Sequence, residues 1–358
     1  EALADACSQF PAHLPTVCNA LKELYVEKAK VLAPEFDKFG MIIEASLDRP
    51  DPYPIRVAIA HAFTALTPLF SEAMVTEIFD FLVKQEALGD RSSEARQAML
   101  NTGVAIIDLH GASVLNALIK LFEENLTANT ASTPEADHVK ESVVILFGRL
   151  ARHLPKGDKR IPTVVDRLLE ALSTPSEIVQ VAVADCLPPL IRAMPEQAEA
   201  YMERLYQTLI AHEKYAARRG AAYGLAGVVR GRGLAALSES GLMQRLREAA
   251  LDKKSYQARQ GAVFAFETLS STLGRVFEPY IISIIPSLLA AFGDANADVR
   301  EATSDAARVI MSKISGHCVK QILPLLLEGL EEKQWRTKKG SIELLGAMAW
   351  CAPKQLSI

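Results

Sequence analysis

The chain has 358 residues, of which 49% are hydrophobic, 23% charged and 6% aromatic, and its formal net charge is −4. This is the composition of a soluble globular protein, and 19 glycines and 18 prolines are too few for long flexible joints between domains. Many aliphatic residues with few aromatic ones argue against an all-β chain and favour repeated helix packing.

Residues 1–47 fit the rest of the pattern least well. Glu1 to Phe10 has the pattern of the second helix of an upstream repeat, and His13 to Lys30 that of a long first helix. The pattern breaks at Pro34 to Gly40. We therefore expect residues 1–47 to hold a partial upstream repeat with an irregular first helix.

From residue 48 onward a helical unit recurs every 38–44 residues. In each unit a small apolar residue, followed by a basic or polar one, opens an apolar helix. The basic or polar residues that mark the repeat are Arg56, Arg96, Lys140, Gln180, Arg218, Arg259, Arg300 and Lys338. A period of this length is the sequence signature of a solenoid built from helix pairs.

The unit around Arg300 shows how one repeat is built. Tyr280 to Phe292 is a first apolar helix, residues 293–298 form a turn, and Val299 to Ile314 is an amphipathic second helix. Small residues such as Gly220 and Gly261 let neighbouring helices approach closely. Because two antiparallel helices cannot cover both of their apolar faces, each pair must stack on the next, which predicts an all-α, right-handed α-solenoid of about eight helix pairs.

Two local signals mark helix ends. Thr174 to Glu177 has the form of a capping box with proline at the first helical position, which predicts a helix start there. Arg230 to Gly233 is expected to be a turn that leaves two guanidinium groups on the surface.

No enzyme chemistry is recognisable. The sequence contains no phosphate-binding G-x-x-x-x-G-K-[ST], and Gly231 to Gly233 lacks both the further glycine and the strand of a dinucleotide site. The seven histidines and five cysteines are dispersed, which indicates core thiols in a reducing compartment. We therefore predict no catalytic residue, no metal and no cofactor.

The apolar stretch Tyr280 to Gly293 falls short of a membrane helix, and no signal peptide is visible. The chain begins at Glu1 without methionine, so we expect a piece of a longer cytoplasmic protein with no membrane partner.

Charge is distributed unevenly. Residues 1–211 carry a balance of −10 and residues 212–358 a balance of +6, with +7 concentrated between Lys214 and Arg259. We expect the helix-pair repeats to form an acidic part, 48–211, and a basic part, 212–358. A rigid basic surface attracts phosphate backbones or acidic proteins. The candidate binding residues are Arg218, Arg219, Arg230, Arg232, Lys253, Lys254, Arg336, Lys338 and Lys339.

A structural role for some of these arginines competes with binding. In stacked helix pairs, aspartates in the turns commonly pair with arginines in a ladder along one edge. The residues positioned for such a ladder are Asp252, Asp294 and Asp298 with Arg218, Arg259 and Arg300. Exposed pairs of this kind add only about 0–1 kcal/mol each.

Several strings carry a family resemblance: Arg218 to Gly227 (RRGAAYGLAG), Arg49 to Tyr53 (RPDPY), Trp335 to Ser341 (WRTKKGS), Leu344 to Gly346 and Gln355 to Ser357. They resemble the central HEAT-repeat region of the general control non-derepressible one family, whose members are large translational activators of the starvation-responsive initiation-factor kinase. The later repeats are also similar, more weakly, to the HEAT region of fungal elongation factor three.

The resemblance implies a non-catalytic, ribosome-associated scaffold. It implies that the part like elongation factor three holds an ATP-binding-cassette partner protein and contributes to contact with the ribosome, through ribosomal RNA or ribosomal proteins. The kinase is expected to bind further along the full protein. Two other readings stay open: a karyopherin-like or phosphatase-scaffold solenoid that carries a protein cargo, and an enzyme, which detectable nucleotide binding would support.

Overall fold

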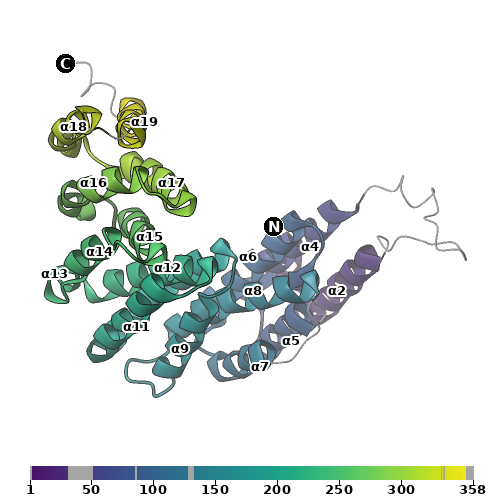
Figure 1. The fold of residues 1–358 in the computed structure, drawn as a ribbon. Helices are drawn as coiled ribbons and strands as arrows, with labels where there is room; N and C mark the ends of the chain where they lie inside the picture. The colour runs from purple at the N-terminus through teal and green to yellow at the C-terminus, as the bar shows by residue number, and fades with distance from the viewer. Residues whose placement is uncertain are drawn as a thin grey trace, which may run out of the picture. The chain divides into compact units, whose positions relative to one another are not determined.

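The computed structural model describes residues 2–30, 51–84, 87–127, 133–331, 333 and 335–351. Within these residues the secondary structure consists of α-helices and short 3-10 turns without a strand, which confirms the all-α prediction. The chain divides into two compact units, residues 1–155 and 156–358 (Figure 1). The predicted break at Pro34 to Gly40 lies outside the described residues.

The first unit contains seven described α-helices: α1 (Ala2–Gln9), α2 (Leu14–Lys30), α4 (Tyr53–Leu66), α5 (Glu72–Lys84), α6 (Ser93–His110), α7 (Leu115–Thr127) and α8 (Pro134–Leu150). Helices α2, α5 and α7 pair with α4, α6 and α8, and the latter three pack on one another in succession. Its core includes Phe79 of α5 and Phe122 of α7, whose ring centroids lie 5.6 Å apart. The two helices predicted before residue 31 are present as α1 and α2.

The second unit continues the same plan: α9 (Ile161–Ala171), α10 (Glu177–Ala193), α11 (Ala198–Ala211), α12 (Tyr215–Arg232), α13 (Ala235–Glu239), α14 (Leu242–Ala250), α15 (Tyr256–Leu273), α16 (Glu278–Phe292), α17 (Ala297–Lys313), α18 (Gly316–Glu331) and α19 (Trp335–Cys351). Helices α10, α12, α15, α17 and α19 are the second helices of their repeats, and each packs on the next. In Figure 1 this row runs from teal to yellow. The described residues therefore form the predicted stack of helix pairs.

Short 3-10 turns join several of these helices: η1 (Pro11–His13), η2 (Thr67–Leu69), η3 (Ala87–Gly89), η4 (Ala151–His153), η5 (Pro195–Gln197) and η6 (Gly274–Phe277). Helices α15 and α16, which η6 connects, together contain an 18-residue window apolar enough to cross a membrane by composition. Half of that window is buried inside the protein, as in core helices of a packed stack.

Local sequence explains where several second helices begin. Ser255 caps α15 by accepting a hydrogen bond from the Ala258 amide at 3.1 Å, and Asn296 caps α17 by accepting one from the Asp298 amide at 2.7 Å. The predicted capping box at Thr174 is wrong. Helix α10 begins at Glu177 after Ser176, whose side chain makes no capping hydrogen bond.

Two glycines set the closest helix contacts. A Cβ atom on Gly220 of α12 would lie 1.8 Å from the carbonyl oxygen of Leu172, and one on Gly261 of α15 would lie 2.1 Å from the carbonyl oxygen of Leu209. Both glycines stand two residues after the arginine that marks their repeat. The expected close approach at these small residues is confirmed.

Candidate interaction surface

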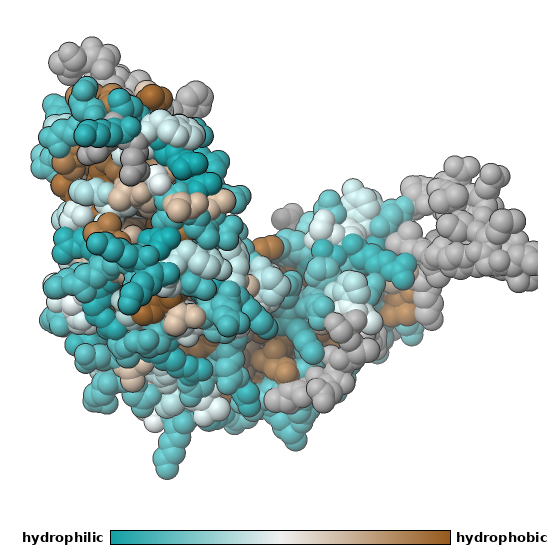
Figure 2. All heavy atoms as spheres, viewed as in Figure 1, coloured by the Kyte–Doolittle hydropathy of each residue, from teal (hydrophilic) through white to brown (hydrophobic). Residues whose placement is uncertain are grey.

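The turns inside the repeats of the second unit each join a first helix to a second helix. We call the turn residues 212–214, 251–255, 293–296 and 333 the turn edge. The residue that marks each repeat lies just inside the following helix, so its side chain is within reach of this edge. Figure 2 shows hydrophilic side chains over most of the visible face, with scattered apolar patches between them.

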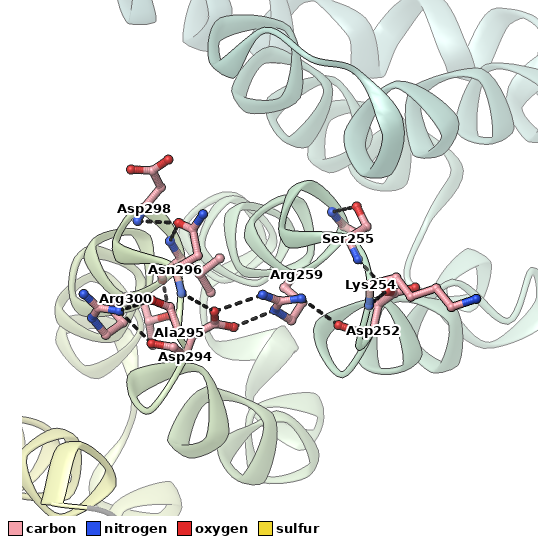
Figure 3. Close-up of polar contacts among 12 residues, drawn as sticks. Asp252, Lys254, Ser255, Arg259, Asp294, Ala295, Asn296, Asp298 and Arg300 are labelled. Atoms are coloured by element: carbon pink, nitrogen blue, oxygen red, sulfur yellow. Dashed lines mark hydrogen bonds and ion pairs between the residues drawn. The ribbon is translucent and has the colours of Figure 1, made fainter.

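Arg259 links two of these turns (Figure 3). Its guanidinium donates to both carboxylate oxygens of Asp294 in the next turn, at 2.5 and 3.0 Å, and to the carbonyl oxygen of Asp252 in its own turn at 2.8 Å. The side chains of Arg259 and Asp294 are only 17% and 7% exposed. The predicted pairing of Arg259 with Asp294 is therefore confirmed as a largely buried salt bridge.

The first unit repeats this arrangement. Arg56 of α4 donates to Asp90, which precedes α6, at 2.7 and 2.9 Å, and both side chains are almost fully buried. Tyr25 of α2 donates to the same carboxylate at 2.5 Å. Arg96 donates to the carbonyl oxygen of Asp90 at 2.6 Å. The marker arginines thus satisfy turn carbonyls and connect neighbouring repeats.

The remaining predicted ladder pairs are wrong. Arg218 does not reach the Asp252 carboxylate, which accepts instead from the amides of Lys254 and Ser255 at 2.7 and 2.8 Å. Arg300 donates to the carbonyl oxygens of Asp294 and Ala295 at 2.7 and 2.8 Å. Within the described residues no ion pair joins Arg300 to Asp298.

Arg218 is removed from the candidate binding residues because it is 2% exposed. Its guanidinium donates to the carbonyl oxygens of His212 and Glu213, each at 2.7 Å, and to the side chain of Gln260. Burial lowers the pKa of this guanidinium. A side chain fixed inside the protein in this way cannot contact a partner.

Arg219 is also removed. Its guanidinium pairs with the buried carboxylate of Glu267 on α15 at 2.5 Å and lies against the rings of Phe264 and Tyr223. Burial opposes the charge, but the hydrogen bonds that Arg219 donates to Glu267 outweigh it and raise the pKa of Arg219. Arg219 therefore connects α12 to α15, which sequence alone could not show because Glu267 lies 48 residues away.

Arg230 and Arg232 do not form the expected turn. They belong to the last turn of α12, and Gly233, with a φ of 102°, follows the helix. Gly231 between them is buried against Pro188 and Ile191, so this segment does pack on the core. Both arginines are about half exposed, at 50% and 46%, and pair with Asp185 at 3.0 Å and Glu239 at 3.8 Å. Because each guanidinium is paired with a carboxylate, the two arginines add little net positive charge to the surface.

Lys253 and Lys254 lie exposed on the turn edge. Within the described residues neither ammonium group has a carboxylate within salt-bridge distance, and the Lys254 side chain extends away from Arg259 in Figure 3. Lys214 is exposed on the preceding turn, and among the described residues it likewise has no carboxylate within salt-bridge distance. It was missing from the candidates, although its place directly before a second helix could have shown its position. These three lysines lie on two neighbouring turns of the turn edge, and Lys333, which is also exposed, lies on its last turn.

A shallow groove adjoins Lys253. It has a volume of about 300 Å³ and is lined by Leu251, Asp252, Arg259, Ala291 and Asp294, among others. The groove thus combines apolar side chains and the largely buried Arg259–Asp294 salt bridge with the exposed ammonium group of Lys253. A partner that contacts Lys253 therefore also meets a packed surface.

The last three candidates lie on α19. Arg336 stacks over the exposed ring of Trp335, with its guanidinium carbon 5.1 Å from the ring centroid. Lys338 is exposed, and Lys339 pairs with Glu343 at 3.3 Å. The structure thus brings these residues together at one end of the unit, apart from the Lys253 turn along the row of helices.

The Arg259–Asp294 salt bridge should make the stability of the fold depend on pH. Burial alone would raise the pKa of Asp294, but hydrogen bonds from Arg259 and the Asn296 amide lower it below the ordinary value. A lowered folded-state pKa contributes stability above the unfolded pKa, and this stability is lost as the pH falls through the folded value. We expect acid unfolding between about pH 5 and pH 2, measured by circular dichroism, to depend less on pH in Asp294→Asn. An unchanged pH dependence would contradict this role.

Among the described residues no cluster of histidine, cysteine, aspartate and glutamate could hold a metal ion.

Two family profiles match the chain: "Stalled ribosome sensor GCN1, HEAT repeats" over residues 1–152 and "EF3 N-terminal HEAT repeat" over residues 218–358.

Curated relatives match along the whole length. The chain is 45% identical over 357 residues to the human "Stalled ribosome sensor GCN1", covering 100% of this chain and 13% of that protein. It is 41% identical over 345 residues to the Saccharomyces cerevisiae "eIF-2-alpha kinase activator GCN1", covering 95% and 13%. An elongation factor 3 from Gonapodya prolifera is 32% identical over 164 residues, 45% of this chain and 15% of that protein. The chain therefore spans about an eighth of its GCN1 relatives.

A solved structure of the karyopherin Kap121p bound to the SUMO protease Ulp1p aligns with a TM-score of 0.48 and 13% identity, over 98% of this chain and 36% of that chain.

Proposed function

Because the chain belongs to the GCN1 family of HEAT-repeat proteins, we propose that it is a non-catalytic docking segment of a cytoplasmic, ribosome-associated regulator of translation. Support comes from the names of its relatives, a stalled ribosome sensor and a kinase activator. We expect the starvation-responsive kinase to bind other parts of the full protein, of which this chain spans 13% in the Saccharomyces cerevisiae relative.

The observation that carries the docking role is the set of three exposed lysines on neighbouring turns, Lys214, Lys253 and Lys254. The turn that holds two of them is fixed by the Asp252 carboxylate and by Arg259. Ammonium groups on a rigid edge attract phosphate groups of ribosomal RNA or an acidic ribosomal protein, and such contacts weaken as salt rises.

We expect the triple exchange Lys214→Glu, Lys253→Glu and Lys254→Glu to lower salt-sensitive co-sedimentation with ribosomes at least tenfold. The three side chains are exposed, so helicity measured by circular dichroism should not change. The control is Lys313→Glu with Lys320→Glu, two exposed lysines of which the first ends α17 and the second lies in α18, away from the turn edge. Equal co-sedimentation of the triple variant and the wild type would refute this surface.

We further propose that residues 218–358, which match the elongation factor 3 repeats, bind an ATP-binding-cassette protein. We expect a pull-down with the full chain from cytosol to recover ribosomes and such an ATPase. Recovery of a Ran-type GTPase or phosphatase subunits in their place would favour the alternative of a cargo-carrying solenoid.

A further inference from the structure

A second groove lies between α17 and α19, away from the three lysines of the proposed docking edge. Its volume is about 270 Å³. Pockets for small molecules usually enclose about 300–1,000 Å³, so this groove has room for one large side chain of a longer ligand. The residues that line it are Phe292, Ala297, Arg300, Glu301, Ser304, Trp335, Arg336, Lys339, Gly340 and Glu343.

The floor of this groove is apolar because α19 lies directly against the end of α16. A Cβ atom on Gly340 would lie 2.3 Å from Cγ of Phe292, so only glycine permits this approach. Phe292 is 5% exposed and Ala297 opens α17 beside it. An apolar side chain of a ligand would therefore meet an apolar surface at the bottom of the groove.

Trp335 forms one lip of the groove. It is 65% exposed, and among the large hydrophobic side chains of the described residues only Ile178 is more exposed. Its indole ring is already oriented by the guanidinium of Arg336 stacked at 5.1 Å. Tryptophan, tyrosine and arginine are enriched among the residues that contribute most of the binding energy in protein interfaces.

The charges around the groove are mainly positive. Arg300, Arg336 and Lys339 line it together with Glu301 and Glu343, and Lys339 is the partner of Glu343 at 3.3 Å. Two further exposed lysines, Lys333 and Lys338, lie within three residues of Trp335. The free positive charge therefore surrounds the aromatic lip.

We propose that this groove binds an acidic peptide segment of a partner protein, with one large apolar side chain inserted beside Trp335 and acidic side chains facing Arg336 and Lys338. The positive surroundings select the acidic charge, and the apolar floor selects the anchor. A phosphate backbone carries a negative charge at every nucleotide and would have to place some of these charges against Glu301 and Glu343. A peptide can keep its acidic side chains beside Arg336 and Lys338 and turn neutral backbone amides, which donate hydrogen bonds, toward the two glutamates. A peptide therefore fits the groove better than RNA does.

The test uses the full chain and a fluorescein-labelled peptide in which one tryptophan is flanked by aspartates and glutamates, followed by fluorescence anisotropy. We expect salt-sensitive binding that weakens at least tenfold in Trp335→Ala and in Arg336→Glu. Both residues are exposed, so circular dichroism should match the wild type. A peptide with serine in place of its tryptophan should bind at least tenfold more weakly.

The matched control is Ile342→Ala, an exposed apolar residue of the same helix outside the groove lining, which should leave binding unchanged. The triple lysine variant of the docking edge should also bind the peptide normally, which separates this proposal from ribosome docking. No binding by the wild type, or equal binding by Trp335→Ala, would overturn the proposal. So would a short single-stranded oligouridylate that binds with the same dependence on Trp335 while the peptide does not.

Discussion

Replacing Gly220 by alanine is expected to destabilise the chain by about 3 kcal/mol, the upper end of the usual cost of overpacking. The added methyl carbon would lie 1.8 Å from the carbonyl oxygen of Leu172, and the obstacle is backbone, which cannot rotate away as a flexible side chain can. Helix α12 must therefore shift away from the end of α9. Urea unfolding followed by circular dichroism at helical wavelengths measures the change.

The matched control for this substitution is Gly346→Ala in α19, where nothing lies within 4 Å of the added carbon. Alanine is favoured over glycine in a helix interior by about 0.5–1 kcal/mol, so this variant should be slightly more stable than the wild type. If both variants lost the same stability, close packing at Gly220 would not be the cause.

Asp90→Ala is expected to cost about 3–5 kcal/mol, because it leaves the charge of Arg56 buried after its main partner has been removed. Arg56 is 1% exposed and donates two hydrogen bonds to Asp90. Its other carboxylate partner, Asp51, is 35% exposed and accepts a single hydrogen bond from Arg56, at 2.9 Å. Thermal unfolding of the full chain should show the loss.

The control pair is Arg149 with Asp108, which has similar geometry but lies at the surface, with 32% and 43% exposure. Asp108→Ala should cost only about 0–1 kcal/mol, since exposed ion pairs contribute little. Equal losses from Asp90→Ala and Asp108→Ala would show that burial does not determine the strength of these bridges.

The period of the marker residues was sufficient to predict the fold. Because each marker residue opens a second helix, the spacing placed α4, α6, α8, α10, α12, α15, α17 and α19 within a few residues of their observed starts. Local capping was harder to predict. At Thr174 a sequence of the right form stands before the helix without capping it, since Ser176 is the residue at the helix boundary.

The candidate surface was only partly predictable, because residues a full repeat away decide whether a basic side chain is paired inside the fold or exposed. Arg219 and Lys254 look alike in the sequence, but Glu267 reaches Arg219 from α15, and no described carboxylate reaches Lys254. Gln260, also on α15, accepts a hydrogen bond from Arg218 in the same way. Charge density therefore identified the basic region, and only packing separated its structural arginines from its accessible lysines.

The link that Arg259 makes between two turns has a mechanical consequence. It ties its own turn to the one at Asp294, so these two repeats resist being pulled apart at this edge. We expect the joint between α15 and α17 to bend least under load, because separating these two repeats must first break both hydrogen bonds from Arg259 to Asp294.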